Sequence, residues 1–203
     1  QFTQTAPDTG RRLSHLDPGN QPPLAVIDQC ILLALCLNIH NTQPSHGLTS
    51  EQMSAFVERV IQHPLNWSVH TMSLLLRSRL EASRTRTVER STLQLQALID
   101  QMPTNDSSVR ERLRFFHALE LPAKWAMQSE LAHRYVSIGV LRSALETFER
   151  VEMWENVVQC LGLLGRQQEG IEVVRDLLEG RKTEAEAQLQ AKRIATSVSR
   201  VPH

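Results

Sequence analysis

The sequence is poor in the residue patterns that build disulfides, metal sites and membrane spans. Its three cysteines, Cys30, Cys36 and Cys160, are too few and too scattered for a disulfide framework and favour a reducing compartment. Neither a Cys-x2-Cys nor a His-x3-His spacing occurs, so the ligand pattern of a structural zinc site is missing. The longest apolar run, residues 24–39, includes polar residues and is shorter than the roughly 20 residues of a membrane span. We expect a buried helix there, and neither a metal nor another cofactor.

Sequence signatures of catalysis are missing as well. The chain has no phosphate-binding loop, dinucleotide-binding fingerprint or nucleophile elbow. The segment 162–165 (Gly-Leu-Leu-Gly) has the outline of a GXXG nucleic-acid clamp, but its apolar centre favours a simple turn. The chain has 22 Lys and Arg residues and 22 Asp and Glu residues. Its net charge is therefore zero, and no overall electrostatic field draws it to nucleic acid or membranes. We expect a protein without catalytic residues or a small-molecule substrate.

Helical periodicity is present along most of the chain. Residues 1–21 lack it and are predicted to be a flexible lead-in. Residues 22–120 repeat a cap or proline, an amphipathic stretch of about three turns, and a break, which predicts irregular helix pairs. Pro22-Pro23 suits a first helical turn, and Thr49-x-x-Gln52 and Ser108-x-x-Glu111 have the capping-box pattern of helix starts. No period-2 alternation occurs, so the predicted class is all-α.

The last third of the chain contains an internal repeat with an offset of 26 residues. Each copy predicts a helix, a glycine-containing turn and a second helix, with a small residue, Ala144 or Gly170, where the two helices approach. We predict two short hairpins over 121–180, in a right-handed α-solenoid of antiparallel helix pairs. Residues 181–203 are predicted to be a polar, helix-prone tail, and the apolar residues near 171–178 predict a tendency to self-associate.

Several sequence blocks resemble a known family. The order of small, glycine and aromatic residues over 132–148 resembles a tetratricopeptide repeat, although the usual period is about 34. Further blocks resemble the tetratricopeptide repeat protein 27 family, including its fungal members, in the region just before and into its first repeats. These blocks are residues 66–68, 87–98, 121–126, 143–145 and 148–158. The resemblance covers about residues 24–180 and ends at the tail, which lacks the signature of a following repeat.

This resemblance implies a biological role that composition and spacing do not. It implies a non-catalytic scaffold for protein–protein interaction, acting as a chaperone cofactor in the assembly of large complexes such as the spliceosomal U5 particle. The implied partners are proteins of a chaperone or assembly complex, and the implied location is the cytoplasm and also the nucleus. Neither a membrane nor a small-molecule substrate is expected.

One cluster of basic residues offers an alternative function. The cluster consists of Arg77, Arg79, Arg84, Arg86 and Arg90. As a patch it would bind RNA or an acidic partner through phosphate or carboxylate contacts. No aromatic residues interleave to stack bases, and cations near a helix end complement its dipole, so a solvated surface is the preferred interpretation.

Two further sets of residues are candidates for partner binding. Tetratricopeptide domains that bind chaperone tails use Lys, Asn and Arg on successive first helices. This chain offers Arg134, Asn156 and Gln159 at comparable places, without matching lysines, so these are weak candidates. The three tryptophans, Trp67, Trp125 and Trp154, each follow a turn. We expect them to fill the core, and exposure as partner-binding side chains is the alternative.

Overall fold

The computed structural model describes residues 21–44 and 46–183, and every regular element within these ranges is a helix. The predicted lead-in and nearly all of the predicted tail lie outside these ranges. The helices, in chain order, are α1 (Val26–Thr42), α2 (Gly47–Ile61), α3 (Trp67–Ala82), α4 (Val88–Gln101), α5 (Val109–Leu113), the 3-10 turn η1 (Phe116–Ala118), α6 (Lys124–Ser137), α7 (Leu141–Arg150), α8 (Trp154–Leu163) and α9 (Gln167–Leu178). The prediction of an all-α helical-repeat array is confirmed.

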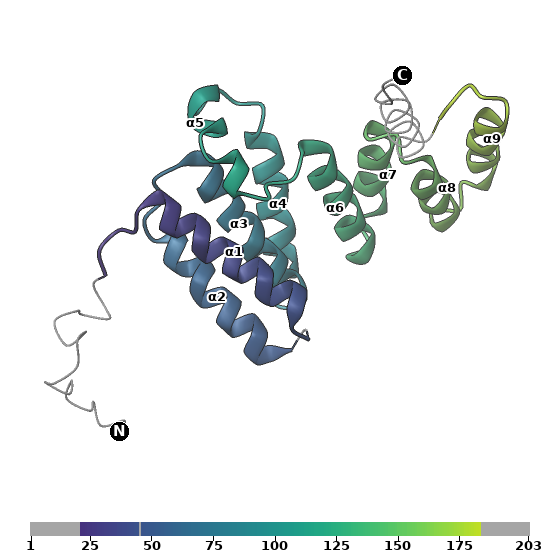
Figure 1. The fold of residues 1–203 in the computed structure, drawn as a ribbon. Coiled ribbons are helices and arrows are strands. Elements are labelled where there is room, and N and C mark those ends of the chain that lie inside the picture. The colour runs from purple at the N-terminus through teal and green to yellow at the C-terminus, as the bar shows by residue number, and fades with distance from the viewer. Residues whose placement is uncertain (1–20, 45, 184–203) are drawn as a thin grey trace, which may run out of the picture.

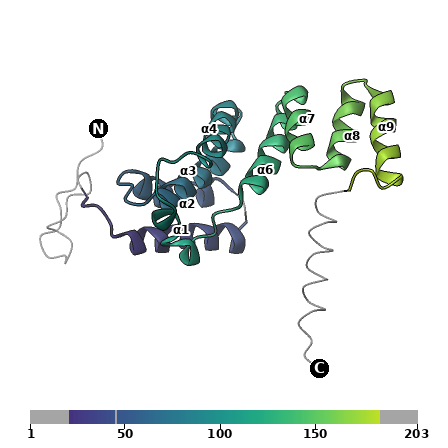
Figure 2. The same ribbon diagram turned by 90° about the horizontal axis from the view of Figure 1, so that it is seen from above.

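The helices form two consecutive parts (Figures 1 and 2). Helices α1 to α4 make a bundle, with α5 at one end, and α6 to α9 continue from it as a row of alternating helices. Within the row α6 packs on α7, α7 on α8 and α8 on α9, and α6 also packs on α4 of the bundle. This nearest-neighbour packing is the arrangement of a solenoid.

Two apolar cores correspond to these two parts. The larger core is formed by side chains of α1 to α4 and the start of α6, including Leu33, Met72 and Leu95. The smaller core lies between α6, α7 and α8 and is centred on Phe148, which has no exposed surface. Tyr135 is the residue that packs against both cores, and its hydroxyl donates to Oε1 of Gln96 on α4 at 2.9 Å.

Helix starts in the bundle differ in part from the capping predictions. His46 caps α2 by accepting from the Thr49 N–H at 3.3 Å, so α2 begins before the predicted cap Thr49, which is buried instead. Ser108 caps α5 as predicted, by accepting from the Glu111 N–H at 3.2 Å. However, α5 has only five residues, and α1 begins three residues after Pro23.

The four helices of the row end in the same hydrogen-bonded turn. In each turn a residue in the left-handed region precedes an N–H that bonds to the carbonyl five residues earlier, which is the Schellman arrangement. The left-handed residues are Gly139 (φ 80°), Glu152 (φ 59°), Gly165 (φ 73°) and Gly180 (φ 71°). The turns after α6 and α8 are related by the predicted offset of 26 residues, because Val140 bonds to Tyr135 and Arg166 to Leu161.

Candidate partner-binding site

Two of the five clustered arginines share one carboxylate. Arg77 Nε lies 3.0 Å from Oε1 of Glu81, and Arg90 Nη2 lies 2.7 Å from the same oxygen. Burial alone would raise the pKa of Glu81, but the hydrogen bonds from Arg90 and Arg77 outweigh it and hold the pKa below its ordinary value. The charge of these two arginines is therefore partly offset within the protein.

A second carboxylate joins two more of the candidate arginines. Glu130 on α6 accepts from Arg79 Nη2 at 2.8 Å and from Arg134 Nη2 at 2.5 Å. Burial would raise the pKa of Glu130, whereas the two arginines lower it, and the net direction is downward. Two cations around one anion leave this triad with one net positive charge.

The remaining candidates are spread over different surfaces. Arg84 and Arg86 are exposed in the turn between α3 and α4. Arg134 is only 9% exposed and donates from Nη1 to the hydroxyl of Ser78. On α8, Asn156 is half-buried and Gln159 is exposed. The structure thus unites Arg79 with Arg134 through Glu130, and it encloses Arg134 between α3, α4 and α6 instead of presenting it beside Asn156 and Gln159.

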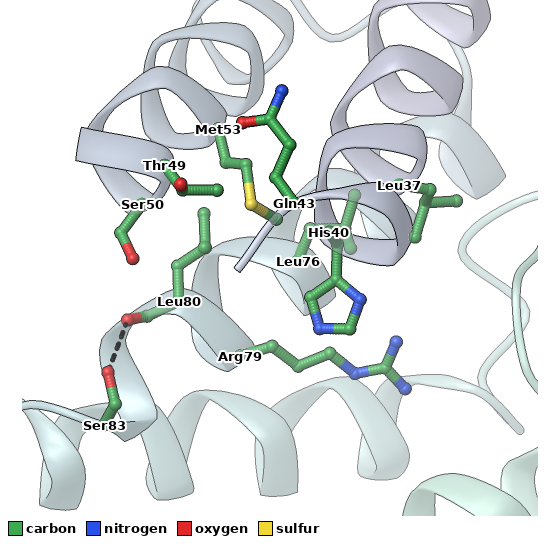
Figure 3. Close-up of a pocket in the computed structure, with 10 residues that line it drawn as sticks. All are labelled: Leu37, His40, Gln43, Thr49, Ser50, Met53, Leu76, Arg79, Leu80 and Ser83. Carbon is green, nitrogen blue, oxygen red and sulfur yellow. Dashed lines mark hydrogen bonds between the residues drawn. The ribbon is translucent and has the colours of Figure 1, made fainter. Parts of the chain in front are cut away.

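A pocket of about 370 Å³ lies beside Arg79, where the end of α1, the start of α2 and the end of α3 meet (Figure 3). Its apolar wall consists of Leu37, Met53, Leu76 and Leu80. Its polar lining residues are His40, Gln43, Thr49, Ser50, Arg79 and Ser83. The size is within the usual range of about 300–1,000 Å³ for ligand pockets. This pocket could not be predicted from the sequence, because its lining residues come from three helices and follow no common spacing.

The tryptophans occupy three different environments. Trp67 is half-buried beneath the guanidinium of Arg112, which lies 4.0 Å from the ring centroid. Trp154 is half-buried against the smaller core, with Lys182 Nζ 4.5 Å from its ring. Trp125, at the start of α6, is 57% exposed. The core prediction is therefore wrong for Trp125, which is not among the buried residues of α6.

Apolar side chains are also exposed at both ends of the array. On α1, Ile27, Ile31 and Leu35 are 51%, 52% and 44% exposed, and their four-residue spacing places them on one helix face. On α9 the exposed apolar side chains include Ile171 and Leu178, which are 51% and 83% exposed. Contiguous apolar surface of this kind makes both helix faces candidates for binding another molecule.

Metal binding, membrane insertion and thiol chemistry are three further possibilities for this part of the chain. Within the described ranges, no three His, Cys, Asp or Glu side chains are grouped so that they could hold a metal ion. No helix in that part of the chain combines the length and hydrophobicity that a bilayer span requires. All three cysteines are buried free thiols, and burial raises the pKa of Cys36 to about 11.

Comparison with known proteins identifies clear relatives. A TPR repeat-containing protein of Schizosaccharomyces pombe is 41% identical over 198 residues, covering 82% of this chain and 24% of the relative. The tetratricopeptide repeat protein 27 homolog of Dictyostelium discoideum is 39% identical over 153 residues, covering 75% of this chain and 18% of the relative. A Saccharomyces cerevisiae protein named as essential for maintenance of the cell wall is 29% identical over 188 residues, covering 86% of this chain and 21% of that protein.

Each match covers only a small part of the relative's own sequence. The chain spans less than a quarter of the length of each of these relatives. No family model matches the sequence. No solved structure matches it either.

Proposed function

Since this chain is related, over most of its length, to the tetratricopeptide repeat protein 27 homolog and other tetratricopeptide repeat proteins, we propose that it is a non-catalytic scaffold segment of a chaperone-linked assembly factor. In this proposal its helix surfaces bind protein partners by shape and charge, without turnover. The partners are a chaperone or an assembly complex, with maturation of the spliceosomal U5 particle as the specific role that the family resemblance implies. The protein acts in the cytoplasm and also in the nucleus.

The apolar stripe on α1 is the observation that carries this proposal. Ile27, Ile31 and Leu35 lie on one face, and each exposes between 44% and 52% of its surface. The inner face of α1 buries Cys30, Leu33 and Cys36. Three further large apolar side chains that remain in water add nothing to the stability of the fold. A protein partner that covers this face would remove that apolar surface from solvent.

The alternative function is binding of RNA or an acidic partner by the cluster of Arg77, Arg79, Arg84, Arg86 and Arg90. The observation in its favour is that Arg84 and Arg86 are exposed and form no ion pair within the described residues. Against it, Glu81 and Glu130 offset the charges of the other three. The two functions predict different effects of salt and of substitutions on partner binding.

Affinity capture from a cell extract, read by mass spectrometry, separates the two functions. The wild-type chain is compared with an I31D/L35D variant and an R84E/R86E variant, at about 0.05 M and about 0.5 M salt. The scaffold function predicts chaperone or assembly proteins that persist at high salt, survive R84E/R86E and disappear with I31D/L35D. A control variant, L93D, changes a single leucine that is 64% exposed on α4, and it should retain the partners.

The opposite pattern would support the alternative. Phosphate contacts release counterions, so RNA or acidic partners should appear at low salt only and vanish with R84E/R86E. Capture that is insensitive to I31D/L35D and carried by RNA would overturn the scaffold proposal.

A further inference from the structure

We propose that the pocket between α1, α2 and α3 binds a peptide segment of the protein partner, and that this segment places an apolar side chain in the pocket beside a carboxylate at Arg79. This inference rests on the proposed scaffold function and names the chemistry of one of its contacts.

The apolar part of the pocket suits a branched or flexible aliphatic side chain. Met53 and Leu76 are almost fully buried, at 4% and 3% exposed, whereas Leu37 and Leu80 are half-buried. Figure 3 shows Met53 and Leu80 extending into the space between the helix ends. Methionine adapts its three torsions to an inserted group, so this wall adjusts to the shape of an aliphatic side chain.

The polar part of the pocket suits an anion. None of the ten residues that line the pocket is acidic, and one of them is Arg79. The Nε and Nη2 atoms of Arg79 donate to Glu130, whereas Nη1 has no hydrogen-bond partner among the described residues. Because Glu130 also binds Arg134, the triad keeps one net positive charge next to the pocket.

His40 completes the polar side of the pocket. The exposed His40 ring has Nδ1 3.2 Å from Oδ1 of Asn41, and Figure 3 shows it at the same end of the pocket as the Arg79 guanidinium. Gln43 also lines the pocket, but Figure 3 shows its side-chain amide directed away from the Arg79 guanidinium. A carboxylate held here would receive charge-assisted hydrogen bonds, which are the stronger class.

The combination of apolar and polar residues in the pocket lining favours protein over nucleic acid as the partner. A nucleic-acid backbone would satisfy Arg79 but would leave the apolar wall of Leu37, Met53, Leu76 and Leu80 without a partner. A peptide in which an aliphatic residue adjoins Asp, Glu or a terminal carboxylate satisfies both parts. Protein is therefore the partner that the pocket favours.

Methyl NMR on the full chain tests this inference with two matched probes. The protein is labelled at methionine methyl groups and titrated with N-acetyl-leucine, which has an aliphatic side chain and a carboxylate, and then with N-acetyl-leucinamide, which lacks the charge. We expect a saturable shift of the Met53 methyl signal with the acid, and about tenfold weaker binding of the amide.

Variants of two neighbouring arginines complete the test. R79Q should remove the preference for the acid, and R79K, which keeps the charge without the planar fork, should retain part of it. R77Q changes an arginine that is paired with Glu81 outside the pocket, so it should bind both probes as the wild type does. The inference is overturned if Met53 shows no saturable shift, if the wild type binds acid and amide equally, or if R79Q keeps the full preference. Because affinity capture relies on α1 and on Arg84 and Arg86, a negative titration leaves the test of the scaffold function intact.

Discussion

Arg134 Nη1 lies 2.7 Å from the hydroxyl oxygen of Ser78, which joins the first helix of the repeat row to the third helix of the bundle. The same guanidinium donates from Nη2 to Glu130, and Ser78 in turn donates to the carbonyl of Ser91 at 2.8 Å. Helices α3, α4 and α6 thus meet at one buried cation. The contact between the two parts of the molecule is therefore a specific polar one as well as an apolar one.

Loss of this cation should destabilise the fold. We expect R134A to lower the free energy of unfolding by about 2–3 kcal/mol, because buried hydrogen bonds to a charged group are lost and Ser78 is left with fewer partners. Urea unfolding followed by circular dichroism measures the change. R142A removes an exposed arginine of α7 and serves as the control, with an expected change below about 0.5 kcal/mol. Equal effects of the two substitutions would contradict the structural role of Arg134.

The Glu130 triad should make stability depend on pH. The arginines hold the pKa of folded Glu130 below its ordinary value of 4.5, so its stabilising contribution is present above that value and is lost as pH falls through the folded pKa. We expect E130Q to lower the melting temperature at neutral pH and to have a smaller effect in acid. Thermal melts of both proteins between neutral and acid pH measure this. A constant difference at every pH would mean that the Glu130 charge contributes nothing.

The turn after α7 has a residue of the wrong type for its backbone. Glu152 adopts φ 59°, a backbone conformation that is strained for residues other than glycine. The equivalent positions in the other three turns are glycines. E152G should therefore raise the free energy of unfolding by about 0.5–1 kcal/mol. G165A, made in the turn after α8, should lower it by about 1 kcal/mol, since nothing but the conformation opposes a methyl group there. Denaturant midpoints that shift in the same direction for both variants would refute this explanation.

The buried Gly170 of α9 should accept a methyl group. A Cβ atom at this position would lie 3.8 Å from Leu161 Cβ and 3.9 Å from Val158 Cγ1, which are ordinary contacts. G170A should stabilise the protein by about 0.5–1 kcal/mol because glycine is unfavourable inside a helix. A144G, at the equivalent position of the first copy, should destabilise it by a similar amount or more. A lower melting temperature for G170A would show that the helices tolerate no extra atom at this crossing.

The thiols should be inert while the protein is folded. Cys36 is fully buried and burial raises its pKa to about 11, so almost no thiolate is present at pH 8. We expect no carbamidomethylation of Cys30, Cys36 or Cys160 by iodoacetamide in native buffer and complete labelling of all three in urea. Intact mass spectrometry measures the number of labels. Rapid labelling in native buffer would show that the bundle opens readily.

Local patterns predicted the helical part of the fold well, and tertiary packing decided the rest. The repeat offset was readable because Gly139 and Gly165 end equivalent helices. The helix expected to run for about three turns after the Ser108 capping box stops at Leu113, because the residues that follow, Phe115, Ala118 and Leu119, pack against the larger core. The start of α2 was misplaced because its cap is a histidine, which is not among the usual capping residues.

The candidate site shows the same division between local and long-range information. The pairing of Arg77 and Arg90 with Glu81 involves residues that are at most nine positions apart in the sequence. The partner of Arg79 is 51 residues away, so neither the triad nor the pocket beside it follows from sequence spacing. The predicted partner-binding roles of all eight candidates remain predictions: Arg77, Arg79, Arg84, Arg86, Arg90, Arg134, Asn156 and Gln159.

The position of Tyr135 between the two cores also has a kinetic consequence. Because the main helix contact of α9 is with α8, and those of α8 are with its two neighbours in the row, these helices can detach one after another while the bundle remains closed. Amide hydrogens should therefore exchange fastest in α9 and more slowly toward α6, with the slowest exchange in α3 and α4. If partners occupy both ends of the array, a pulling force between them would unfold the helices of the repeat row first. Unfolding would stop at Tyr135, where the row is held to the bundle.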